Sequence, residues 1–149
     1  MKKIALAVGM FLAFSVAGFS NDGAGGWDWS KHDDAMTDQT QYIFLKMTVD
    51  DESPAIMLIY VPGENHWVWG LMRHETWTTD KEVDVTYRLG KEPAVDGFFM
   101  ADRGRFYDNI KDLAKFLTYS TIVVKPQKGG QYKYDMTGLA KTIKMAGIK

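Results

Sequence analysis

The feature that most constrains the fold is a period-two alternation at residues 82–90. Apolar and aromatic side chains (Val83, Val85, Tyr87 and Leu89) alternate with polar ones (Asp84, Thr86 and Arg88), and Gly90 follows. Such alternation indicates a half-buried strand, because successive side chains of a strand point to opposite faces of its sheet. The chain must therefore supply a sheet with one face covered.

Further strands are expected on both sides of this stretch. Residues 41–49, 66–72 and 94–101 also read as strands, and Trp27 and Trp29 are expected in a short edge strand. Residues 55–61 form a continuous apolar run, which is typical of a central strand covered on both faces. Turn residues at 50–54 and 62–65 separate these runs. The acidic residues 30–38 are expected to form a further turn. The short connections favour a meander of antiparallel hairpins.

The period changes in the last third of the chain. Ile110, Leu113, Ala114 and Leu117 stand at helical spacing, with Asp108 or Asn109 as the expected cap. Strands at residues 121–124 and 131–136 follow, and a last helix capped by Thr137 carries Leu139, Ala140 and Ile143 on one face. We therefore predict an α+β fold: an antiparallel sheet or sandwich meander with two helices from the C-terminal half packed on it.

The first 20 residues have the pattern of a signal peptide. Lys2 and Lys3 precede an apolar run at residues 4–17, and small residues before positions 18 and 21 offer cleavage sites after Ala17 or Ser20. A retained membrane anchor is the alternative. The expected domains are a signal peptide at 1–20, a partly flexible segment at 21–40 and one β-rich domain at 41–149, in the periplasm or outside the cell.

Composition narrows the function classes. The chain has no cysteine, so it has no disulfide, thiol nucleophile or cysteine metal site. No basic face stands out, and nucleic acid is not an expected partner. His32, Asp33 and Asp34 could hold a metal with Asp28 or Asp38, but a solvated acidic loop is favoured. We expect no cofactor, no metal and no catalytic residues, because no motif of a known enzyme class occurs.

Several segments together resemble a known family. They are residues 34–38 (Asp-Ala-Met-Thr-Asp), a strand pair, Val85-Thr86-Tyr87-Arg88, the helix at 110–117, residues 121–124 (Thr-Ile-Val-Val) and residues 134–139 (Tyr-Asp-Met-Thr-Gly-Leu). This order is similar to that of the VasI/TagO family of small exported bacterial proteins, some of which are associated with type VI secretion. Members often carry an arginine-cysteine pair where this chain has Ile59-Tyr60. The resemblance implies an envelope location and no specific activity.

The candidate partner-binding residues are Arg88, Asp38, Arg103, Arg105 and Trp77. Arg88 could meet a carboxylate or phosphate of a partner, or it could pair with Asp38 or another local acid and hold residues 34–38 to the sheet. The second interpretation is favoured, because a single outward arginine usually finds a structural partner. Residues 73–81, which include Trp77, and residues 102–105 are the candidates for a protruding loop, and Arg103 and Arg105 are the expected cationic tips of the second. The remaining tryptophans, including Trp67 and Trp69, are favoured as core over an exposed platform.

The expected function is that of a non-catalytic envelope protein that binds a protein partner, and the family resemblance adds an association with type VI secretion. The alternative is an inhibitor of a lysozyme-type cell-wall hydrolase or a phage superinfection-exclusion factor. A peptidoglycan-remodelling enzyme is a third class, which would require an essential carboxylate.

Overall fold

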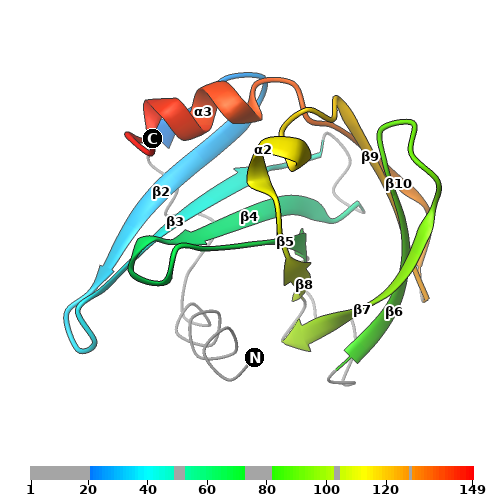
Figure 1. Ribbon diagram of the computed structural model, residues 1–149, viewed down its shortest axis with the longest axis horizontal. Coiled ribbons are helices and arrows are strands. Elements are labelled where there is room, and N and C mark those ends of the chain that lie inside the picture. The colour runs from blue at the N-terminus through cyan, green and yellow to red at the C-terminus, as the bar shows by residue number, and fades with distance from the viewer. Residues whose placement is uncertain (1–20, 49–52, 73–81, 103–104, 128) are drawn as a thin grey trace.

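The computed structural model describes residues 21–48, 53–72, 82–102, 105–127 and 129–149 of the chain. These residues form one antiparallel sheet of ten strands, in the order β1-β2-β3-β4-β5-β8-β7-β6-β9-β10. The sheet is strongly curved, and both helices lie on its concave side (Figure 1). The predicted class, an antiparallel sheet with two late helices, is confirmed.

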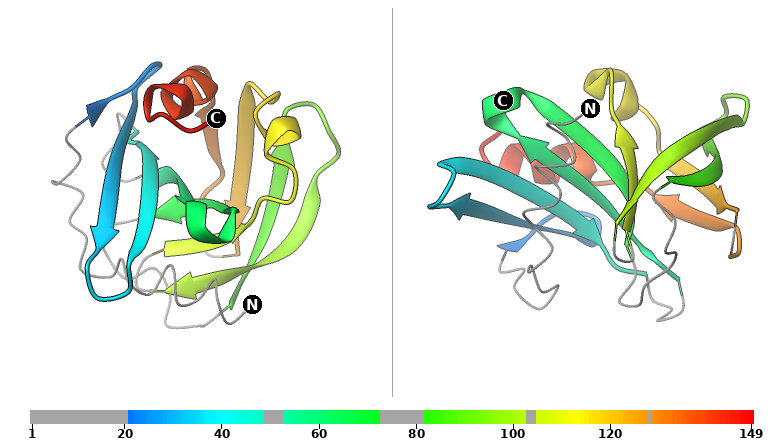
Figure 2. Two further views of the ribbon diagram at one scale, coloured as in Figure 1. Left: turned by 60° about the vertical axis from the view of Figure 1, so that its left-hand side comes forward. Right: turned by 90° about the horizontal axis from the view of Figure 1, so that it is seen from below.

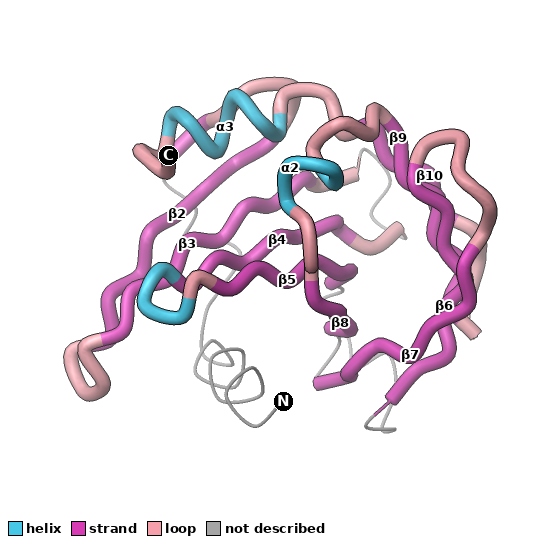
Figure 3. The backbone as a smooth tube through the Cα atoms, in the orientation of Figure 1, coloured by secondary structure: helices cyan, strands magenta, loops and turns pink. Residues whose placement is uncertain are grey.

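The elements follow one another closely along the chain, and helices make up only a small part of it (Figure 3). The strands are β1 (Asn21–Asp22), β2 (Trp27–Asp34), β3 (Gln39–Lys46), β4 (Ala55–Val61), β5 (His66–Met72), β6 (Glu82–Leu89), β7 (Val95–Asp102), β8 (Arg105–Asn109), β9 (Thr121–Pro126) and β10 (Tyr132–Asp135). The helices are η2 (Pro62–Glu64), α2 (Leu113–Phe116) and α3 (Leu139–Met145).

The residues that alternate in polarity at 82–89 form strand β6. Val83 and Val85 are buried, and Tyr87 and Leu89 pack against the same core, as predicted. The meander of hairpins is confirmed for β1 to β5. It then breaks, because β5 pairs with β8, and β6 lies between β7 and β9.

The sheet buries apolar side chains on both of its faces. The larger cluster lies on the concave face, where it includes Phe116 of α2 and Leu139 and Ile143 of α3. The second cluster comes from alternate positions of β3, β4, β5 and β8, such as Leu45 and Met57. The central-strand prediction for residues 55–61 is thereby confirmed, since only Tyr60 of β4 is not fully buried.

Three predictions for the strands needed correction. Residues 30–34 are strand rather than turn, because β2 pairs with β3 along its whole length. β2 is also not an edge strand, since β1 pairs with it on the other side. Strand β8 was not predicted; its five residues are too few to show a clear period. Residues 21–40, predicted to be partly flexible, contain β1 and β2.

Both helices differ from their predicted limits and caps. The first is a single turn, since Ile110 donates its backbone N–H to Trp67 O in continuation of β8. Its cap is Asp112 rather than Asp108 or Asn109. The cap of α3 is Gly138 rather than Thr137, whose backbone N–H is bound by Asp135. No helix within the described residues is long and apolar enough to cross a membrane.

Helix α3 joins the two ends of the curved sheet (Figures 1 and 2). Ala24 N, in the β1–β2 turn, donates to Thr142 Oγ1 at 2.9 Å, and this hydroxyl lies 2.8 Å from Gly138 O. Lys46 Nζ of β3 reaches Asp135 O of β10 at 2.7 Å. These contacts join residues about 90 to 120 positions apart, so they fix the curvature of the sheet.

Replacement of Gly138 tests this junction. Its φ of 91° is left-handed, and a Cβ there would overlap Ala24 O and lie 2.8 Å from Gly25 N. Gly147 has a similar φ of 83° with nothing within 4 Å, so it is the matched control. We expect Gly147→Ala to lower the free energy of unfolding by about 1–2 kcal/mol, and Gly138→Ala by about 1–3 kcal/mol more, both measured by urea denaturation. Equal losses would show that the close approach of the backbones carries no stability.

Candidate functional site

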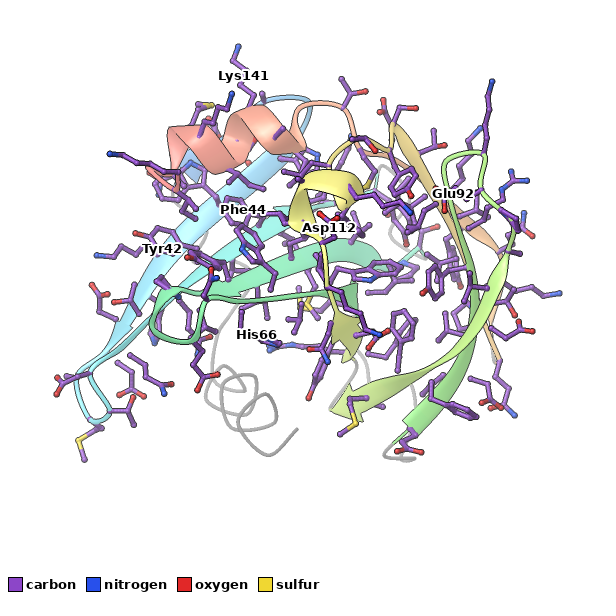
Figure 4. All side chains as sticks on the ribbon, in the orientation of Figure 1. Tyr42, Phe44, His66, Glu92, Asp112 and Lys141 are labelled. Atoms are coloured by element: carbon purple, nitrogen blue, oxygen red, sulfur yellow. The ribbon has the colours of Figure 1, made fainter. Side chains whose placement is uncertain are left out.

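A cavity lies on the concave face, between β5, β6 and β8 and the short helix α2. It has a volume of about 290 Å³. We call it the concave-face pocket; it is lined by Trp69, Tyr87, Leu89, Glu92, Asp108, Asn109, Ile110, Lys111, Asp112, Lys115, Phe116 and Tyr119. Figure 4 labels Glu92 in the β6–β7 turn and Asp112 next to α2, two of these residues.

Aromatic rings form the floor and one wall of this pocket. Trp69 is 3% exposed, and its ring lies 5.7 Å from that of Phe116. Tyr87 meets Trp69 edge to face at 5.5 Å and Phe99 in the same manner at 5.7 Å. Such a set of mutually packed rings gives a rigid apolar floor.

Charged groups gather around the aromatic floor. Asp108 is the register partner of Trp69 in the β5–β8 pair, so both side chains lie on the concave face. Glu92 forms an ion pair with Lys115 at 3.6 Å. Asp112 Oδ1 accepts the backbone N–H of Lys115 at 3.0 Å and caps α2. Helix α2 is thus held at the pocket by its Asp112 cap and by the ion pair between Lys115 and Glu92.

The ionisation of two tyrosines reflects this environment. Burial, followed by the negative charge of Asp108, raises the pKa of the Tyr87 phenol. Burial, followed by hydrogen bonding to Glu92, raises the pKa of Tyr119. Glu92 also raises the pKa of Lys115. Both phenols therefore stay protonated at neutral pH and can donate hydrogen bonds.

A second cavity lies on the outer face of the sheet, which is turned away from the two helices. Its volume is about 230 Å³, and we call it the outer-face pocket; it is lined by Thr86, Tyr87, Arg88, Ala94, Val123, Lys125 and Gln131. The side chains of Arg88 and Lys125 are exposed, and neither forms an ion pair or hydrogen bond with another described residue. Thr86 Oγ1 donates to Asp96 Oδ1 at 2.6 Å.

The five residues predicted for partner binding do not form one site. Arg88 lies on the outer face of β6, whereas Asp38 occupies the β2–β3 turn, with β3, β4, β5, β8 and β7 between them in the sheet. The predicted pairing of Arg88 with Asp38 does not occur. Arg105 begins β8, opposite Asp102 and Met72. Trp77 and Arg103 lie outside the described residues.

The remaining candidates have structural roles. Asp33 binds Thr40 Oγ1 at 2.7 Å and Lys31 at 3.4 Å, and Asp34 binds the backbone N–H of Met36. In the part of the chain that the structure describes, no group of three or more acidic or histidine side chains could hold a metal ion. Trp67 and Trp69 are core residues, as favoured from the sequence.

Sequence reasoning did not assign the concave-face pocket. Asp108 and Asn109 were considered only as helix caps, and Glu92 lies in a turn with no pattern of its own. The signal that could have indicated the pocket is Asp108 itself. This carboxylate stands two residues after Phe106, at a position where the alternation of the strand predicts an inward, apolar side chain. A charge at a position of apolar periodicity is often functional.

The chain was also compared with known proteins. No family model, no curated protein and no solved structure matches it significantly. The resemblance to the VasI/TagO family therefore stays a prediction.

The cap of α2 offers a test of how the pocket wall is held. Asp112→Ala removes the acceptor for the Lys115 N–H, so we expect a loss of about 1 kcal/mol in the free energy of unfolding. Asp112→Asn keeps a capping oxygen, so we expect the free energy of unfolding to fall by only a few tenths of the loss in Asp112→Ala. Urea denaturation measures both. A loss of similar size in the two variants would mean that charge, rather than capping, holds α2.

Proposed function

We propose that the protein is a non-catalytic, exported binding module that docks a protein partner on the outer face of β6, β7 and β9. The observation that supports this most directly is a pair of cations, Arg88 and Lys125, which line one pocket on that face and form no ion pair with a described residue. Two long, exposed cations of this kind are suited to a carboxylate or phosphate supplied by another molecule.

Exposed apolar side chains lie on the same face. Phe98 is 72% exposed and Met100 is 41% exposed, and both belong to β7. Phe98 pairs with Asp84 of β6, and Lys125 of β9 pairs with Thr86, two residues further along β6. Phe98 and Lys125 therefore lie in neighbouring rows of the same face. An apolar patch beside cations is typical of a protein-binding surface, where aromatic residues and arginine are enriched. The expected partner presents an apolar side chain close to an acidic one.

The proposed location is the periplasm or another envelope site. It is supported by the leader pattern of residues 1–20 and by the family resemblance, which adds an association with type VI secretion. Inhibition of a cell-wall hydrolase is the alternative function, but the loops at 73–81 and 103–104 that this would use lie outside the described residues.

Partner capture tests the proposed function. The full chain, tagged at its C-terminus, is expressed with its own leader and cross-linked in intact cells. We expect one stoichiometric envelope partner, whose yield falls at least tenfold in an Arg88→Ala/Lys125→Ala variant, because the charged contacts are lost. The matched control is Lys141→Ala/Lys144→Ala, which removes the same charge from exposed positions of α3 (Figure 4).

Two results would overturn the proposal. One is a partner yield that falls equally in both double variants, which would indicate an effect of net charge alone. The other is turnover of purified cell-wall material that disappears in Asp108→Asn, which would make the protein an enzyme. Cell fractionation and N-terminal sequencing of the recovered chain test export separately.

A further inference from the structure

The concave-face pocket has features that the outer-face proposal does not use. It lies on the opposite side of the sheet from Arg88 and Lys125, since Tyr87 and Arg88 are successive residues of β6. Its volume of about 290 Å³ is at the lower end of the range for ligand sites. A site of this size takes a single side chain or a small molecule.

The charges around this pocket are not balanced. Glu92 is neutralised by Lys115, and the carboxylate of Asp112 is engaged at the start of α2. Asp108 Oδ1 accepts only the backbone N–H of its neighbour Asn109, at 2.8 Å, and no ion pair with a described residue involves Asp108. Lys111, the other cation in the lining, is exposed and likewise forms no ion pair with a described residue.

The unmatched carboxylate stands over an aromatic floor. Asp108 faces Trp69 across the β5–β8 pair, and its charge is felt by the Tyr87 phenol, which lies edge to face with Trp69. A partly buried anion favours a cation that restores its charge balance. The faces of tryptophan and tyrosine rings attract ammonium and guanidinium groups as well.

We propose that the concave-face pocket binds a primary ammonium or guanidinium group, with Asp108 as its counter-charge and the rings of Tyr87 and Trp69 as its walls. The ligand is either a free linear amine or the side chain of a lysine or arginine in a peptide. Aromatic and carboxylate groups also bind neutral sugars in other proteins. A neutral sugar, however, would leave the charge of Asp108 without a counter-charge.

Titration of the full-length protein with defined probes tests this. The probes are 1,5-diaminopentane, N-acetyl-lysine amide, their fully N-acetylated forms and N-acetylglucosamine. Binding of each probe is measured by calorimetry and by changes in the amide chemical shifts of the protein. We expect the amines to bind and to move the amide signals of residues 108–116, and N-acetylation to abolish binding. Similar affinity for both amines would assign the site to free amines; binding of the lysine amide alone would assign it to a peptide. Either result supports the proposal.

Isosteric variants then test the role of Asp108. Asp108→Asn should weaken amine binding at least tenfold. Asp84→Asn, which makes the same change at an exposed outer-face position of β6, should leave it unchanged. The proposal is overturned if no amine binds at millimolar concentration, if the acetylated forms or N-acetylglucosamine bind as well as the amines, or if the shifts lie outside the pocket. If Asp108→Asn does not fold, the comparison of amines with their acetylated forms on the unmodified protein still tests whether the pocket binds a cation.

Discussion

The structure depends on the close approach of two glycine-containing turns, one at each end of the sheet. Gly25 and Gly138 both have left-handed φ values, and a Cβ on either would overlap the backbone of the opposite turn. The Thr142 hydroxyl lies between them and accepts the Ala24 N–H. Because this contact joins the β1–β2 turn to α3, it holds the first and last strands at a fixed separation. A ten-stranded sheet without it would be free to open.

The curvature set by this junction determines what lies on the concave face. It directs the inward rings of β5, β6 and β7 toward one another, so that Trp69 meets both Tyr87 and Phe99 at 5.3–5.5 Å. Helix α2 is only one turn long, yet its Phe116 completes this cluster. The floor of the concave-face pocket is therefore part of the core. Its polar rim, by contrast, comes from β8, α2 and the β6–β7 turn.

The sequence predicts which face of each strand is covered better than it predicts which strands pair with each other. Period-two alternation correctly places Val83, Val85 and Tyr87 on the covered face, because burial acts on each strand separately. It contains no information on pairing, so the insertion of β8 between β5 and β7 could not be foreseen. The site was missed for the same reason. Asp108 and Trp69 are far apart in the sequence and become neighbours only through the β5–β8 register.

The two proposed sites are linked by the geometry of a single strand. Tyr87 is in the lining of both pockets, whereas Arg88 lines the outer-face pocket, and alternation directs the side chains of these two residues to opposite faces. The two pockets accordingly differ in charge: the lining of the concave-face pocket has three carboxylates and two lysines, whereas the charged residues in the lining of the outer-face pocket are Arg88 and Lys125. A shift of β6 by one residue would exchange these faces and bury Arg88. Apolar burial of Val83 and Val85 opposes that shift, so the same hydrophobic pattern that specifies the fold also keeps the two sites apart.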